Sequence, residues 1–180
     1  MTIDLIKQFE AVPTAYPAAP SGLSAEAAAL DPDMIWARIE AYIAHRWTPR
    51  QVIWIVEGDG DWCPNLAPLE VTAEEMWNGT AWVSATVYAS PYGGYRLTQA
   101  GLFRFTGTVG ANAGDVPAAV FEAFKRLASY YADCDDRAGA NSVSERLGDL
   151  ETSVTRNPAW MARAMQNSGA ADLLRPYRRA

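Results

Sequence analysis

The sequence predicts an α+β fold in which a helical core carries a small antiparallel β insertion between its first and second main helices, with extended arms at both ends. Three observations lead to this prediction. Apolar residues recur at helical spacing within residues 31–47 and 117–134. Residues 51–107 alternate with period two and are rich in β-branched and aromatic residues. Prolines interrupt residues 1–30, and residues 158–180 end in a basic tail, so we interpret these two segments as the arms.

Length and composition indicate one soluble globular domain with extensions. The chain has 180 residues, of which 49% are apolar and 20% charged, and this apolar content is sufficient to bury a core. We expect residues 31–157 to form the body. The N-terminus lacks a continuous apolar stretch, and glycines and a proline interrupt the longest uncharged run. Neither a secretory signal nor a membrane helix is therefore expected.

The N-terminal arm, residues 1–30, is interrupted by Pro13, Pro17 and Pro20. Its stretch SAEAAAL is long enough for one short helix at most, so the alternatives are an extended arm and a disordered segment.

The first main helix is predicted over residues 31–47. It begins at the sequence DPD, in which Asp31 is the N-cap and Pro32 fits the first turn. It ends before Pro49, because the residue preceding a proline is disfavoured in the helical conformation.

The β-rich segment, residues 51–107, contains about five predicted strands. The stretches QVIWIVE and LEVT are the first two, with GDGD as a turn after QVIWIVE. Asn78-Gly79 predicts a type I′ hairpin turn, because both central residues of that turn need positive φ. The stretches YGGYRLT and GLFRFTG predict a further pair.

Three helices are predicted after the β-rich segment. The long helix, residues 117–134, begins at Pro117 and has one apolar face. A weaker helix is predicted over residues 142–154. A C-terminal helix then begins at Pro158 and ends at Gly169, and a basic tail follows it.

The charges of the chain are unevenly distributed. Acidic residues outnumber basic ones two to one in residues 1–155, whereas residues 156–180 contain five arginines and one aspartate. An acidic body offers few cationic partners to phosphate groups, which disfavours tight DNA binding by the body. The basic tail is suited to contact nucleic acid or an acidic protein surface.

No catalytic, cofactor or metal constellation is found in the sequence. His45 is the single histidine, and no nucleophile elbow accompanies it. Cys63 and Cys134 belong to no CxxC pair. Asp59 and Asp61 resemble the start of a calcium loop, but the later ligands of such a loop are missing. We therefore expect no enzyme activity, no cofactor and no metal ion.

Aromatic residues are unusually frequent. The chain has seven tryptophans and eight tyrosines, and both types are enriched where proteins contact proteins. They either fill the core face of the sheet or form a subunit interface. The interface candidates are Trp77, Trp82, Tyr88, Tyr92 and Trp160.

Two segments carry a resemblance to a known family. One is Val116-Pro117, followed by an apolar helix that contains the pair Tyr130-Tyr131, and the other is the terminal stretch LLRPYR. Together with a helix ending in YIAHRWT and a variable β-rich region, they resemble the head-to-tail connector, or adaptor, proteins of tailed bacteriophages and phage-derived gene transfer agents. The resemblance covers residues 31–180. The long N-terminal arm and the extra residues 138–157 depart from the simplest members.

The resemblance implies a structural role. Such adaptors form a ring, commonly of twelve copies, beneath the portal protein of a DNA-filled head, and they support a stopper or other neck or tail protein. DNA passes through the ring without specific binding. The chain is then expected in the bacterial cytoplasm during assembly and afterwards in the neck of the particle. The C-terminal segment of these adaptors reaches towards the portal, and the implied docking residues are Leu173, Leu174, Arg175, Pro176, Tyr177, Arg178 and Arg179.

A second hypothesis comes from a different class of protein. A small monomeric ligand-binding module would use the β-rich segment and its aromatic residues to form a pocket. That hypothesis predicts a stable monomer with a pocket, whereas the adaptor hypothesis predicts rings on a portal.

Overall fold

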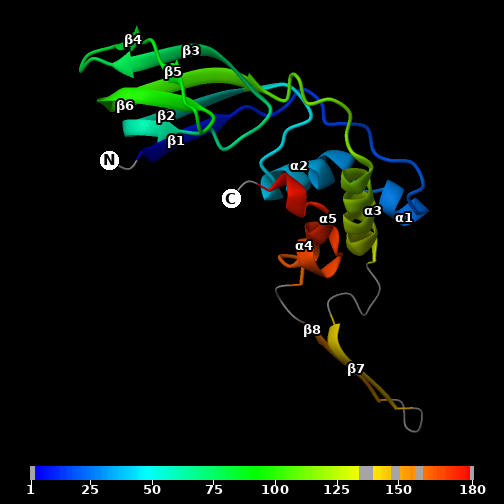
Figure 1. The fold of residues 1–180 in the computed structure, drawn as a ribbon. Coiled ribbons are helices and arrows are strands. Elements are labelled where there is room, and N and C mark those ends of the chain that lie inside the picture. The colour runs from blue at the N-terminus through cyan, green and yellow to red at the C-terminus, as the bar shows by residue number, and fades with distance from the viewer. Residues whose placement is uncertain (1–2, 134–139, 147–150, 157–159, 179–180) are drawn as a thin grey trace. The chain divides into compact units, whose positions relative to one another are not determined.

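The fold is that of a computed structural model, which describes residues 3–133, 140–146, 151–156 and 160–178 (Figure 1). The chain forms two compact units. The sheet unit comprises Met1–Pro17 and Ala44–Asp115, and the helical unit comprises Ala18–Ile43 and Val116–Arg178. The two units therefore alternate along the chain, and each is built from two separate segments.

The sheet unit is built on an antiparallel sheet that has six strands within the described residues. The strands are β1 (Asp4–Glu10), β2 (Arg50–Trp62), β3 (Leu69–Trp77), β4 (Trp82–Ser84), β5 (Tyr88–Ala89) and β6 (Tyr95–Val109). Their order is β1-β2-β6-β3-β4, and β5 pairs with β6 (Figure 1). The sequence 78–81 connects β3 and β4, which confirms the hairpin predicted at Asn78-Gly79. The predicted type I′ turn with these two central residues is not formed, because the Asn78 N–H donates to the Ala81 carbonyl oxygen at 3.0 Å, so that Asn78 flanks the turn.

The sheet has an inner face that holds the core of this unit and an outer face. On β2, Val52, Trp54 and Val56 are fully buried, and they belong to one apolar cluster with Phe105 of β6. Successive side chains of a strand point to opposite faces. Ile53 and Ile55 therefore lie on the outer face, where both side chains are half-exposed.

The helical unit contains short helices around α3 (Figure 1). Its helices are α1 (Ala25–Ala28), α2 (Pro32–Tyr42), α3 (Ala118–Ala132), α4 (Ala164–Asn167), α5 (Ala170–Leu173) and the 3₁₀ turn η1 (Arg175–Tyr177). α3 contacts α1, α2, α4 and α5. Trp36 of α2 is fully buried, and its ring centroid lies 5.0 Å from that of Phe124 on α3. An aromatic contact therefore joins the two longest helices.

The predicted start of α2 is confirmed. Asp31 is the N-cap, and its carboxylate accepts a hydrogen bond from the backbone N–H of Asp33 at 3.0 Å. The helix ends at Tyr42, five residues before its predicted end. Helix α1 lies within the predicted N-terminal arm and is capped by Ser24.

The predicted fold class is wrong. In the described part of the chain an antiparallel sheet is the main element, and the helices are few and short. The structure is therefore not the helical core with a small β insertion that the sequence predicted. One reason lies in the GDGD stretch, which we interpreted as a turn that ends a strand. Gly58 and Gly60 have φ values of 136° and 111°, and the register of β2 against β6 shifts between them. The glycines thus form a bulge inside a strand of 13 residues.

The helix predicted over residues 142–154 is also wrong. This region forms the hairpin of β7 (Ala140–Arg146) and β8 (Glu151–Arg156). Serine, threonine and valine make up most of the strand centres, and β-branched residues favour strands over helices. Gly148, which we interpreted as a helix interruption, lies outside the described residues.

Candidate functional site

The C-terminal segment is folded onto the helical unit. Leu174 is fully buried and Leu173 is half-buried, and α5 contacts α3. Gly169, with φ of 74°, ends α4 and directs the chain into α5. Leu174 is therefore a core residue of this unit.

The polar part of the segment is more accessible. Arg175, Pro176 and Arg178 are exposed, and Tyr177 is half-buried. The Arg178 guanidinium lies 4.7 Å from the centroid of the Tyr42 ring, and its Nη1 donates a hydrogen bond to the Tyr42 hydroxyl at 3.2 Å. Arg179 lies outside the described residues. Docking of this segment to a portal protein stays a prediction. In the folded unit, the side chains of Arg175, Pro176 and Arg178 are the ones in this segment that a partner can reach.

Two of the interface candidates form one aromatic cluster on the sheet. Trp77 and Trp82 lie directly opposite each other on β3 and β4, with ring centroids 5.4 Å apart. The Arg104 guanidinium lies 4.7 Å from the centroid of the Trp82 ring. The same guanidinium donates two hydrogen bonds of 2.7 Å to the Glu75 carboxylate. Each partner thus fixes Arg104 against the outer face of the sheet.

The hydrogen bonds from Arg104 hold the pKa of Glu75 below its ordinary value, because they outweigh the opposite effect of burial. The stability from this pair is present above the ordinary carboxyl pKa and is lost as the pH falls through the lowered value. We expect Glu75→Gln to flatten the acid limb of a plot of the free energy of unfolding against pH, measured by urea denaturation between about pH 6 and pH 3. Glu70→Gln, at an exposed site on the same strand, is the control. Parallel curves for wild type and Glu75→Gln would contradict the assignment.

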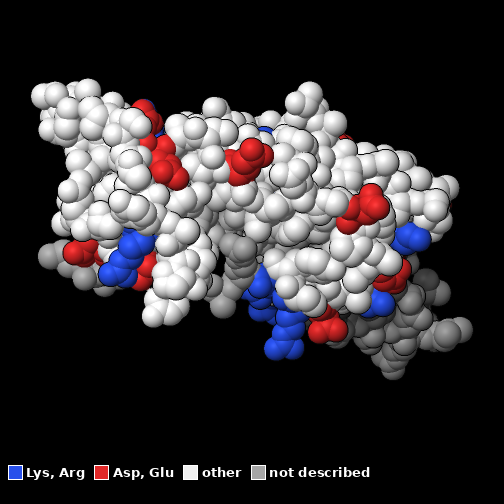
Figure 2. Space-filling view, turned by 45° about the horizontal axis from the view of Figure 1, so that its top comes forward, with Lys and Arg blue, Asp and Glu red and all other residues white. Residues whose placement is uncertain are grey.

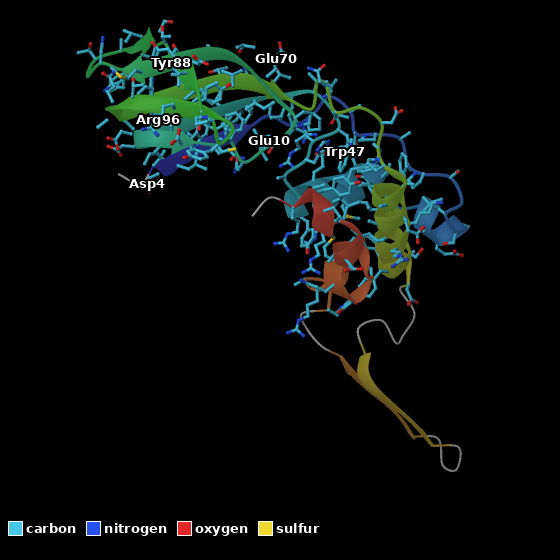
Figure 3. The ribbon with its side chains drawn as sticks, viewed as in Figure 1. Asp4, Glu10, Trp47, Glu70, Tyr88 and Arg96 are labelled. Atoms are coloured by element: carbon cyan, nitrogen blue, oxygen red, sulfur yellow. The ribbon has the colours of Figure 1, made fainter. Side chains whose placement is uncertain are left out.

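The other interface candidates belong to other elements of the chain. Tyr88 of β5 is 61% exposed (Figure 3), and Tyr92, which follows β5 in the chain, is 84% exposed. Trp160 belongs to the helical unit, where its ring centroid lies 5.7 Å from that of Tyr130. Trp77 and Trp82 are thus in ring contact with each other, whereas Trp160 is in ring contact with Tyr130.

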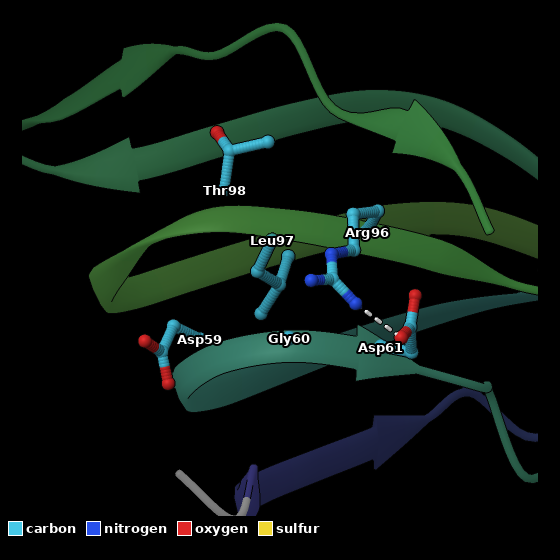
Figure 4. Close-up of a pocket in the computed structure, with 6 residues that line it drawn as sticks. All are labelled: Asp59, Gly60, Asp61, Arg96, Leu97 and Thr98. Atoms are coloured by element: carbon cyan, nitrogen blue, oxygen red, sulfur yellow. Dashed lines mark hydrogen bonds and ion pairs between the residues drawn. The ribbon is translucent and has the colours of Figure 1, made fainter.

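Most aromatic rings of the inner face contact one another. The Trp62 ring centroid lies 4.6 Å from that of Phe105, and Tyr95 lies 4.9 Å from Phe105. A hollow of about 540 Å³ opens in the sheet unit (Figure 4). Its lining is Asp59, Gly60, Asp61, Arg96, Leu97 and Thr98. Arg96 forms an ion pair with Asp61 across it. This lining contains no aromatic residue, so the hollow is not the aromatic pocket that the ligand-binding hypothesis predicts.

Sequence reasoning missed the polar contacts of β1. Glu10, at the end of this strand (Figure 3), accepts hydrogen bonds from Arg46 at 2.5 and 3.0 Å and from Arg50 at 3.2 Å. The side chains of the two arginines are only 8% and 4% exposed. Gln8 lies opposite Trp54, whose indole N–H donates to the Gln8 amide oxygen at 3.1 Å. The stretch DLIKQFE contains only two strand-favouring residues, Ile6 and Phe9, so its local signal for a strand is weak, and we interpreted it as part of the proline-interrupted arm.

Charged side chains form no broad patch of one sign on the face shown in Figure 2, where small groups of them are separated by large uncharged areas. Within the described residues, no His, Cys, Asp or Glu cluster of three or more is placed to hold a metal ion. None of the helices in the described part of the chain combines the length and the apolar character needed to cross a membrane.

Comparison with models of known protein families, with curated proteins and with solved structures finds no match for this chain.

Proposed function

We propose that this chain is a structural neck protein of a tailed phage or phage-like gene transfer agent. Copies of it form an adaptor ring that joins the portal of the DNA-filled head to the next neck or tail protein. DNA passes through the ring without specific binding. The proposal rests on the resemblance of residues 116–133 and 173–178 to the adaptor family.

One observation carries the proposal beyond the sequence resemblance. The two resembling segments are far apart in the chain, yet α3 and α5 contact each other in the helical unit. Leu174 of the terminal motif is fully buried there, as are Val120 and Leu127 of α3. The two motifs thus pack against each other in the helical unit, and this contact gives a structural reason for both motifs to occur in one chain.

Two further observations agree with a ring. Subunits in a ring contact each other through two different surfaces, and the exposed aromatic residues of the sheet unit offer contact residues of the types enriched at interfaces. The acidic composition of residues 1–155 gives DNA phosphates few cationic partners. A channel with that property lets DNA slide.

The proposal is tested by deleting the gene and examining the resulting particles by electron microscopy. We expect DNA-filled heads and separate tails, and we expect the wild-type gene supplied from a plasmid to restore joined particles. The restored particles should show a ring of this chain between portal and tail. Joined particles without the chain would contradict the proposal.

A further inference from the structure

Strand β1 is held in the sheet by backbone pairing and a few polar contacts, with little burial. Six of its seven residues are exposed, and the apolar Leu5 and Phe9 are 46% and 49% exposed. It pairs with β2 alone, at the edge of the sheet. None of its residues belongs to the apolar cluster on the inner face.

The surface that receives β1 recognises particular side chains. We call it the β1 slot, and it consists of the β2 edge with Arg46, Arg50, Trp54 and Asn65. Asn65 donates to the Gln8 amide oxygen at 2.8 Å, and the Trp54 indole donates to the same oxygen. The two nearly buried arginines both donate to the Glu10 carboxylate. The slot thus selects a strand with glutamine and, two residues later, a carboxylate.

The segment that follows β1 is long and contains no helix or strand. Residues 11–24 separate β1 from α1, and they include Pro13, Pro17 and Pro20. A fully extended segment of this length spans about 45 Å. Prolines favour extended conformations and reduce collapse of a linker. Residues 11–17 belong to the sheet unit, where Pro13 is buried and the Arg50 guanidinium lies 5.5 Å from the centroid of the Tyr16 ring. These residues would move together with β1, and residues 18–24 are the part suited to carry the strand beyond its own sheet.

We propose that β1 is exchanged between copies, so that β1 of one chain occupies the β1 slot of the next chain in the ring. This inference rests on the proposed ring. A second copy carries the same Gln8 and Glu10, so the contacts within one chain are reproduced between two chains at low cost. The strand and the slot are different surfaces, and their contact is therefore of the head-to-tail kind that propagates around a ring.

The test uses two full-length variants, Lys7→Cys and Ile55→Cys, each with Cys63→Ser and Cys134→Ser. Lys7 lies opposite Ile55 in the register of β1 against β2. The two variants are co-expressed, assembled and treated with a short bifunctional thiol reagent. Exchange predicts a cross-linked heterodimer. The matched control combines Lys7→Cys with Glu70→Cys, an exposed position on β3, and should give no heterodimer.

A chain with both Lys7→Cys and Ile55→Cys shows whether β1 pairs natively. In assembled particles it should give covalent oligomers if β1 is exchanged, and only internally cross-linked monomers if it is not. The second result, in particles that contain the chain as a ring, overturns exchange and leaves the proposed function intact. If the chain is absent from particles, the proposed function fails. Strand exchange is then tested in concentrated purified protein with the Lys7→Cys and Ile55→Cys chains mixed. A cross-linked heterodimer of these two chains supports exchange, and the absence of that heterodimer overturns it.

Discussion

Leu174→Ala is expected to lower the free energy of unfolding by about 2–5 kcal/mol, the range for removing a fully buried leucine side chain. Leu174 has no exposed surface, and it ends the helix that contacts α3. Truncation leaves a cavity among helices that are each too short to be stable alone. Deletion of residues 173–180 removes the same anchor and should at least equal this loss.

The measurement is urea denaturation followed by far-ultraviolet circular dichroism and tryptophan fluorescence. Arg175→Ala, at the next and exposed position, is the matched control and should change stability by less than about 0.5 kcal/mol. Because this control keeps the fold, any failure of Arg175→Ala particles to join heads and tails reports on docking. A Leu174→Ala protein as stable as the control would show that the segment is not packed as described.

Helix ends and local turns could be predicted from the sequence because their signals are local. Asp31 caps α2 through a hydrogen bond to a residue two positions away, and Asn78-Gly79 connects strands that are adjacent in the chain. The burial of Leu174 could not be predicted in the same way. It depends on α3, which lies about 40 residues earlier, and the basic residues around Leu174 are equally typical of a free tail.

The sheet was underestimated for a related reason. Glycine punctuates both turns and bulges, and only the pairing partner distinguishes the two. Gly58 and Gly60 of β2 continue to oppose β6 on either side of the register shift. Similarly, β1 becomes a strand because β2, more than 40 residues away, offers it a paired edge. The exposure of the Tyr88 and Tyr92 side chains likewise could not be predicted from the amino-acid composition.

Glu10→Ala is expected to have the second large effect, because Glu10 is the carboxylate that both Arg46 and Arg50 contact at the end of β1. Removing one partner of a buried ion pair costs about 3–5 kcal/mol. The Glu10 side chain is 20% exposed, and Arg50 also donates to the Thr48 hydroxyl at 2.8 Å. We therefore expect a smaller loss, of about 2–3 kcal/mol, within the range for hydrogen bonds to charged groups.

Glu10→Gln separates charge from shape. It retains a hydrogen-bond acceptor of the same length and should lose less stability than Glu10→Ala. Amide hydrogen exchange localises the effect, because local opening releases β1 without unfolding the inner strands. Both variants should speed exchange of the β1 amides, alanine more than glutamine, while β2 amides that pair with β6 keep their protection. Unchanged β1 protection in Glu10→Ala would mean that backbone pairing alone retains the strand, and that the two arginines do not select it.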